Sequence, residues 1–211
     1  MAKNYAITIG RQFGSGGREI GARLGELLGI KTYDKELLKL AADKKGIHPD
    51  YLRRVDEKAN NSLLYTLAMG VSMHRAGHTG VEMPINDKLF MAQTEVIKEL
   101  AEQESAIFVG RCADYILRHH PMRISIFIYS DYESRVARVM KEQDCPRKEA
   151  EDLLSKTDKS RVNYYNFYTG KKWGKHENYH IAIDSSLLGI EGTARVLADV
   201  VKDFLKKEGV E

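Results

Sequence analysis

The chain has 211 residues, of which 43% are hydrophobic and 30% are charged, a composition that suits one soluble globular domain. No apolar run approaches the about 20 residues of a membrane-spanning helix, and the first residues lack the pattern of a secretory signal. The net charge of +3 comes without a basic stripe, which argues against a nucleic-acid partner. Two widely separated cysteines favour a reducing, cytoplasmic compartment, so we expect a cytoplasmic protein with a small anionic ligand and no membrane partner.

Four short apolar runs predict buried strands. Each is rich in β-branched or aromatic residues and is followed by glycine, serine or aspartate within a few positions. These runs cover residues 5–9, 106–109, 124–128 and 180–183.

Helical apolar stripes separate the predicted strands. The first carries Ile20 and Leu24 and stops at Gly29, the second follows a cap at Asn86, and the third is capped by Asp131. The last stripe covers residues 194–205. Strands that alternate with helices predict an α/β fold in three layers, with a mostly parallel sheet and helices on both faces. Ligands of such folds lie at the carboxyl ends of the strands.

Two regions interrupt this alternation. Residues 34–85 and 144–175 read as insertions that cover the ligand edge of the sheet, and such coverings often move. We therefore expect a single domain with a core of residues 1–33, 86–143 and 176–211.

A glycine-rich segment follows the first predicted strand and opens the first helix. Its glycines permit positive φ and a close approach of the backbone to a ligand. Amides of the loop and of the helix start then point at one place, which suits a phosphate group. The residues expected to hold nucleotide phosphates are Gly10, Gly14, Ser15, Gly16, Gly17 and Arg18.

The loop departs from the standard phosphate-binding pattern G-x-x-x-x-G-K-[ST]. If Gly16 is the glycine before the lysine, Gly17 stands in the place of the lysine and Arg18 follows it. Arg18 is then the candidate for the missing positive charge. Either Glu19 stands where a magnesium-binding hydroxyl group is expected, or that hydroxyl group is displaced.

The same glycines allow a second interpretation. Their spacing also fits short-chain dehydrogenases, which bind NAD(P), and Tyr168 with Lys172 supplies the Tyr-x-x-x-Lys pair of those enzymes. However, residues 29–34 are too polar and too short for the second strand of a dinucleotide fold. The dehydrogenase therefore remains the alternative.

Four landmarks together resemble the cytidylate kinase family, especially its divergent cytidylate kinase-like branch, over most of the chain. They are ITIGRQFGSGG (residues 7–17), YDKELL (33–38), FVGRCAD (108–114) and IDSSL (183–187). The resemblance implies a P-loop fold like that of the nucleoside monophosphate kinases. In that fold the insertion at residues 34–85 binds the acceptor, and residues 144–175 form a lid.

The resemblance implies roles for individual residues. Arg111 corresponds to the arginine that holds the acceptor phosphate, for which a planar guanidinium group is well suited. Cys112 replaces the aspartate of the family, and whether Asp114 substitutes for it stays open. Asp34 corresponds to the aspartate that opens the acceptor-binding helix, where an N-cap role is an equal possibility.

The lid of the family carries an Asp-x-x-Arg pair, which Asp158 and Arg161 match. The resemblance implies that one residue reads the acceptor base and the other clamps phosphate. The i, i+3 spacing puts both on one helix face, although without the family context they would read as an exposed ion pair. Arg135 and Arg138 also share a face, directed either to the ATP phosphates or to solvent.

The activity implied by the resemblance is phosphoryl transfer from ATP, with Mg²⁺, to a cytidylate-like nucleoside monophosphate. Such catalysis is mostly positioning and charge neutralisation, which makes Arg18, Arg111 and Arg161 the catalytic candidates. The alternatives are a nucleotide-binding protein without kinase activity and the dehydrogenase. No residue is expected to form a zinc site, because the H-E-x-x-H string at residues 176–180 runs into a strand instead of lying on a helix.

Overall fold

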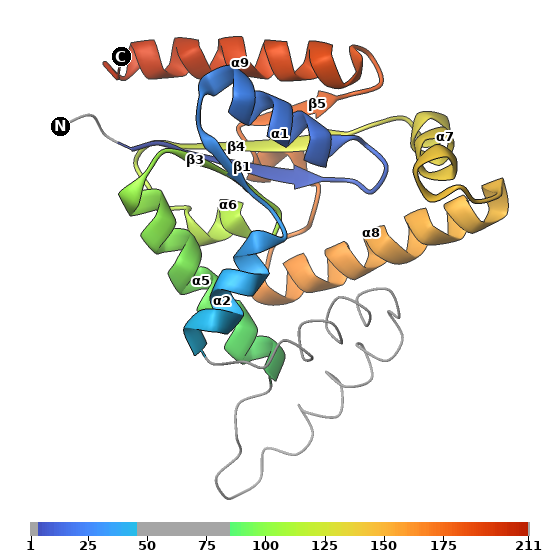
Figure 1. Ribbon diagram of the computed structural model, residues 1–211, viewed down its shortest axis with the longest axis horizontal. Coiled ribbons are helices and arrows are strands. Elements are labelled where there is room, and N and C mark those ends of the chain that lie inside the picture. Colours follow the sequence, from blue (N-terminus) through green and yellow to red (C-terminus); the bar gives the residue numbers. More distant parts are fainter. Residues whose placement is uncertain (1–3, 46–84, 211) are drawn as a thin grey trace, which may run out of the picture.

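The computed structural model describes residues 4–45 and 85–210 (Figure 1). In these residues five parallel strands form one sheet in the order β2-β3-β1-β4-β5. The strands are β1 (Ala6–Arg11), β2 (Lys31–Tyr33), β3 (Ala106–Val109), β4 (Arg123–Tyr129) and β5 (Ile181–Asp184). The helices are α1 (Gly17–Leu28), α2 (Glu36–Lys45), α5 (Ile85–Gln103), α6 (Ala113–Ile116), α7 (Tyr132–Gln143), α8 (Arg147–Thr169), the 3₁₀ helix η1 (His176–Asn178) and α9 (Gly189–Lys207).

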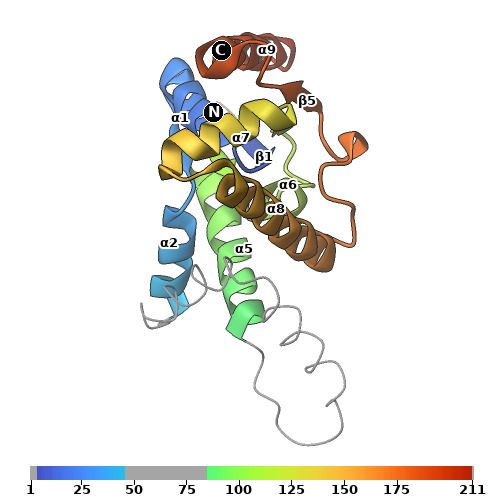
Figure 2. The ribbon, with the colours of Figure 1, turned by 90° about the vertical axis from the view of Figure 1, so that its right-hand side faces the viewer.

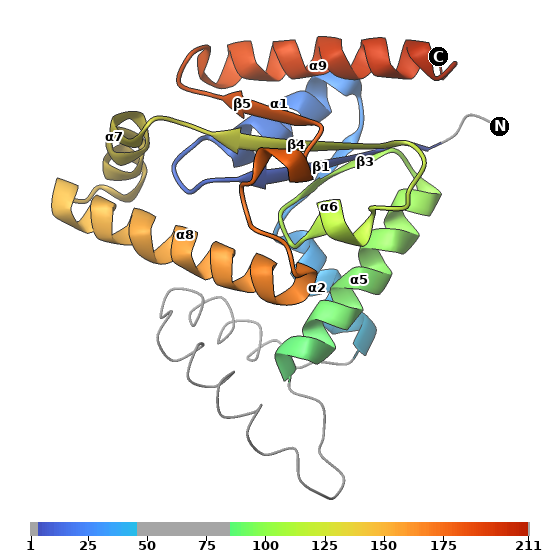
Figure 3. The same cartoon turned by 180° about the vertical axis from the view of Figure 1, so that it is seen from behind.

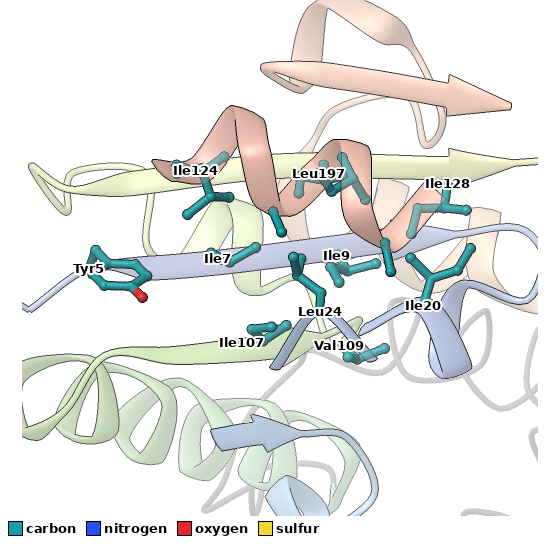
Figure 4. Close-up of a cluster of buried hydrophobic side chains, with 14 of the residues drawn as sticks. Tyr5, Ile7, Ile9, Ile20, Leu24, Ile107, Val109, Ile124, Ile128 and Leu197 are labelled. Carbon is teal, nitrogen blue, oxygen red and sulfur yellow. The ribbon is translucent and has the colours of Figure 1, made fainter. Parts of the chain in front are cut away.

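Alternating side chains of the sheet divide the core between its two faces. Ile7 and Ile9 of β1 pack with Leu24 of α1 in a cluster that α9 also covers, and Figure 4 shows this layer. Ala6 and Phe108 belong to a second cluster, which α2, α5 and α6 complete on the other face. Burial on both faces is typical of a parallel sheet. The predicted three-layer α/β fold is confirmed.

Helices α7 and α8 form a third group at the carboxyl end of the strands. They pack against each other through Val136, Val139 and Leu154, and Phe13 of the glycine-rich loop joins this cluster. Figure 2 shows the two helices together, and Figure 3 shows α8 running beneath the sheet toward α5. The predicted lid segment is therefore built mainly of one long helix that contacts the loop.

The four predicted strands are confirmed as β1, β3, β4 and β5, and β2 is a fifth that the apolar pattern does not show. It has three residues, lies at the edge of the sheet and exposes Lys31, so burial imprints little pattern on it. Tyr33 stacks on Phe108 of the neighbouring strand, with ring centroids 5.8 Å apart. In this sheet β3 lies next to β1 and β2 lies at the edge, whereas in the 3-2-1-4-5 order of a dinucleotide fold β2 lies next to β1. This strand order contradicts the dehydrogenase alternative.

Most predicted helix ends are confirmed. Gly29 ends α1 with a φ of 66°, and the Asp131 carboxylate caps α7 by accepting a hydrogen bond from the Ser134 amide at 2.9 Å. The predicted cap at Asn86 is wrong, because α5 already begins at Ile85.

Two further segments bear on the predictions. Helix α8 ends at Thr169, so Tyr168 and Lys172 do not share a helix, and the Tyr168 hydroxyl donates to Asp87 instead. Of the predicted acceptor-binding insertion, residues 46–84 lie outside the described residues. Within the described part of the chain, no helix is both long enough and apolar enough to span a bilayer.

Candidate functional site

Residues 10–17 join β1 to α1 at the carboxyl edge of the sheet. Gly14 and Gly16 have φ angles of 73° and 70°, in the left-handed region that favours glycine. Helix α1 begins directly after Gly16, and within residues 4–45 and 85–210 no side chain caps its first turn. The loop therefore presents backbone amides at a helix N-terminus, an arrangement that suits an anion.

Serine side chains hold the loop in this shape. The Ser15 hydroxyl is buried and lies 2.9 Å from the Gln12 carbonyl oxygen and 3.2 Å from that of Ile128. The Ser185 hydroxyl donates to the Ser15 carbonyl at 2.7 Å, which ties the predicted IDSSL landmark to the loop. The Ser15 side chain and its carbonyl are thus engaged within the protein, and these bonds fix the shape of the loop.

The turn after β3 lies beside this loop, because β3 pairs directly with β1. Three successive residues, Gly110, Arg111 and Cys112, have φ angles of 78°, 56° and 57°. Two of them carry side chains, for which the left-handed region costs about 1–2 kcal/mol per residue. Such strain persists where the surrounding structure enforces it, commonly at functional sites. The turn presents Arg111 at the strand end, where the sequence predicts a phosphate ligand.

Arginine side chains gather around Asp34, which follows β2. Its carboxylate accepts from Arg18 Nε at 2.9 Å and lies 3.4 Å from an Arg11 guanidinium nitrogen. Helix α2 begins two residues later, and the backbone of Asp34 bonds into it twice: its carbonyl accepts from the Leu37 amide, and its amide donates to the Glu36 carboxylate at 3.2 Å. The Asp34 side chain therefore faces the arginines instead of capping the helix.

Electrostatics show how closely these arginines lie. Burial is the main cause that lowers the pKa of Arg11 to about 9; the neighbouring charges of Arg161, Arg111 and Arg18 contribute to this shift, and Asp34 opposes it. Burial is also the main cause of the lowered pKa of Arg161; Asp158 and Asp34 oppose the shift, and Arg111 and Arg135 add to it. Because arginine stays protonated in proteins, these shifts mark charged guanidinium groups that lie close together and are largely removed from water.

The inner face of α8 lies against the glycine-rich loop. One oxygen of the Asp158 carboxylate accepts from the Phe13 amide at 2.8 Å, and the other accepts from the buried Arg135 guanidinium at 2.7 Å. Arg161 donates to the Arg11 carbonyl oxygen at 2.8 Å, and its guanidinium lies 5.6 Å from the centre of the Phe13 ring. The predicted lid pair therefore contacts the loop itself.

A buried acid lies behind the β3 turn. Asp114 accepts from the Tyr165 hydroxyl at 2.7 Å, one helical turn beyond Arg161 on α8. Burial raises the pKa of Asp114, and burial with the adjacent Asp114 charge raises the pKa of Tyr165. Burial likewise raises the pKa of the Cys112 thiol. Asp114 thus anchors α8 and does not point into the arginine cluster.

The structure brings the predicted site residues together in two groups. Arg18, Arg111, Asp34 and Arg161 meet around Arg11, whereas Arg135 and Asp158 pair beside Phe13. Arg138 reaches the loop separately: its Cζ is 3.2 Å from where a Cβ of Gly16 would stand.

Sequence reasoning missed two residues, Arg11 and Tyr165. A sequence signal for Arg11 does exist. Arg11 is the last residue of β1, directly before a loop in which Gly17 stands in place of the usual lysine, so a nearby arginine is a candidate for the missing charge. No sequence signal indicates Tyr165, because its partner Asp114 lies on a distant segment.

The described residues contain no group of three histidine, cysteine, aspartate or glutamate side chains that could hold a metal ion. In the H-E-x-x-H segment, residues 176–178 form η1, and His180 accepts from the Ser125 amide at 3.2 Å.

Comparisons with solved structures find the same fold in an uncharacterized protein and in several kinases. An uncharacterized protein from Eubacterium ventriosum ATCC 27560 is 29% identical, with a TM-score of 0.67 over 96% of this chain and 99% of that one. A gluconokinase from Sinorhizobium meliloti 1021 is 13% identical (TM-score 0.55; 98% and 99% covered), and a shikimate kinase from Bacteroides thetaiotaomicron is 12% identical (TM-score 0.53; 94% and 98% covered). At these identities the two kinases show a shared fold alone.

The family comparison goes further than the fold. The search of curated proteins gave no significant match. Residues 6–187 match the family described as the cytidylate kinase-like family, a span that includes the loop, the arginine cluster and α8. This match supports phosphoryl transfer as the general class of chemistry. The chain belongs to the cytidylate kinase-like family.

Proposed function

We propose that this protein transfers the γ-phosphoryl group of ATP to a nucleoside monophosphate, with a cytidylate-like acceptor as the first candidate. The gathering of guanidinium groups beside the glycine-rich loop and the turn after β3 carries this proposal. In the described part of the chain this cluster is made up of Arg11, Arg18, Arg111, Arg135 and Arg161, together with the carboxylates of Asp34 and Asp158. Triphosphate and monophosphate groups would neutralise this charge, and guanidinium groups bind them with paired hydrogen bonds.

The proposed reaction is a direct displacement. An oxygen of the acceptor phosphate attacks the γ-phosphorus, the bond from that phosphorus to the β–γ bridging oxygen breaks, and ADP leaves as a nucleoside diphosphate forms. Negative charge spreads over the transferred group in the transition state, so fixed guanidinium groups around it are the main requirement.

The two ligands are assigned to the two sides of the cluster. The loop amides from Gly10 to Gly17, with Arg18 and Arg135, are proposed to hold ATP. Arg111 and Asp34 are proposed to hold the acceptor, with Arg161 between the two ligands. Acceptor binding by Asp158 would require it to leave the Phe13 amide and Arg135, its present partners.

Magnesium is proposed to enter with the nucleotide, since Mg²⁺ usually keeps several waters and binds substrate phosphates. The donors in the described residues fit a protein-held ion poorly. The Ser15 hydroxyl faces backbone carbonyls, and the Asp34 carboxylate is engaged by arginines. No step of the proposed mechanism depends on a metal ligand from the protein.

The second candidate is a protein that binds nucleotide without turnover. Gly17 in the lysine position and Cys112 in place of the family aspartate favour it. ATP would then bind tightly, and nucleoside monophosphates would leave ADP formation unchanged.

Purified protein with ATP, Mg²⁺ and a panel of nucleoside monophosphates tests the proposal. ADP should form only with an acceptor present, and Arg111→Met should abolish this. Arg118→Met, which removes an exposed arginine on the same segment, should keep wild-type turnover. Failure of every acceptor to stimulate ADP formation would rule out the kinase.

A further inference from the structure

The position of the missing lysine is occupied by another side chain. A Cβ built on Gly17 would stand 2.5 Å from the Arg11 Cβ and 3.0 Å from its Cγ, closer than side-chain atoms approach one another. Gly17 has an ordinary helical backbone and not a positive φ, so it is needed for room and not for conformational freedom. The stem of Arg11 therefore fills the space from which a P-loop lysine would start.

The far end of Arg11 lies against the turn after β3. A Cβ on Gly110 would stand 1.9 Å from one Arg11 guanidinium nitrogen and 3.0 Å from its Cζ. The guanidinium is thus pressed on the backbone of the turn that presents Arg111. Arg11 spans from the glycine-rich loop to the strand end where the acceptor phosphate is expected.

Arg11 lies largely out of solvent in a positively charged setting. Its side chain is only 20% exposed, and three other arginines lower its pKa. Among the described residues Asp34 is the carboxylate that opposes this effect; it lies 3.4 Å away and makes its shorter contact, 2.9 Å, to Arg18. A buried guanidinium in this setting is stabilised by a polyvalent anion.

We propose that Arg11 is the phosphate-binding cation of the loop, in the role that a lysine at the position of Gly17 has in a standard P-loop, and that its ligand is a nucleotide polyphosphate. The inference deepens the proposed function and rests on it for the identity of the ligand. Arg18, the candidate by sequence, has a side chain that is 57% exposed and ranks second.

Binding of inorganic pyrophosphate, measured by calorimetry, tests this role without any turnover. Loss of a charged hydrogen-bonding partner predicts about 10- to 150-fold weaker binding for Arg11→Met. Arg23→Met removes the same charge from the outer surface of α1, where Arg23 pairs with Glu26 and Glu191, and should bind as the wild type does. Arg18→Met should lose less than Arg11→Met.

A double variant that moves the positive charge from position 11 to position 17 tests whether the two positions are interchangeable. A gain in binding by this variant could not result from a folding defect. Arg11→Gly combined with Gly17→Lys removes the obstructing stem and places a cation at the standard position. This double variant should bind pyrophosphate at least about 10-fold more tightly than Arg11→Gly alone. Thermal melts of all variants identify those that fold, and Arg11→Gln replaces Arg11→Met if the latter does not.

Each result decides the proposal. Unchanged binding in folded Arg11 variants, a larger loss in Arg18→Met, no gain in the double variant, or no binding by the wild type would overturn it. The kinase proposal can fail on its own. If pyrophosphate binding depends on Arg11 but no acceptor gives turnover, the role of Arg11 stands and the kinase proposal is refuted. If the protein turns over ATP but Arg11→Met binds pyrophosphate as tightly as the wild type, the kinase proposal stands and the role of Arg11 is refuted.

Discussion

The contact between Asp158 and the glycine-rich loop makes a quantitative prediction. The Asp158 side chain is 18% exposed and its partner Arg135 is 8% exposed, with 2.7 Å between their charged atoms. Asp158→Asn keeps an oxygen that can accept from the Phe13 amide but removes the negative charge. Arg135 is then left buried without its carboxylate, and its Nε already has no hydrogen-bond partner among the described residues.

The expected cost follows from burial. Removing one partner of a fully buried ion pair costs about 3–5 kcal/mol, and the partial exposure and retained hydrogen bond here reduce it to about 2–3 kcal/mol. In a chain of 211 residues this lowers the midpoint of thermal unfolding by about 4–12 °C.

Urea unfolding of Asp158→Asn and Asp152→Asn at pH 7 measures this cost. Asp152 is an exposed residue of the same helix, so its variant controls for the loss of a charge on α8. If the two variants differ by less than about 0.5 kcal/mol, Asp158 does not stabilise the loop and the reasoning is refuted.

Two further predictions concern the turn after β3. Gly110→Ala should lose more stability to urea than Gly29→Ala, and only Gly110→Ala should weaken pyrophosphate binding. Both glycines have a positive φ, but only the Cβ at 110 meets Arg11, so equal effects would refute the placement of the guanidinium. Asp114→Asn should gain stability relative to the wild type as the pH rises from 4 to 7. Burial raises the pKa of Asp114, so the folded wild type binds this proton more tightly than the unfolded chain does. This contribution to the stability of the wild type is fully present below the unfolded pKa of about 3.9 and is lost as the pH rises through the folded pKa, whereas Asp114→Asn has no such proton to lose. A difference in urea midpoint that stays constant with pH would contradict this.

The central strands and the long helices could be predicted because burial imprints a period on them. Strand β2 could not be predicted, because it is an edge strand of only three residues, one of them exposed. Its apolar pattern is too short to distinguish it from a loop. Its presence still decides the topology, since it pairs with β3 and leaves β1 in the middle of the sheet.

The candidate site shows a different limit. Spacing could predict that Asp158 and Arg161 share a helix face, but not that this face meets Phe13 and Arg11, residues about 150 positions earlier. Gly17 shows the same limit, because in the sequence it indicates only that the phosphate-binding lysine is missing. The tertiary contact with Arg11 is needed to show that the missing side chain leaves space for another cation.

Helix α8 makes the site a mechanically linked unit. Asp158, Arg161 and Tyr165 lie within two turns of a 23-residue helix, about 35 Å long, and respectively contact the glycine-rich loop, the end of β1 and the segment after Arg111. A rotation of this rod that frees one contact strains the other two. Three segments that are far apart in the sequence therefore hold their relative positions through a single helix.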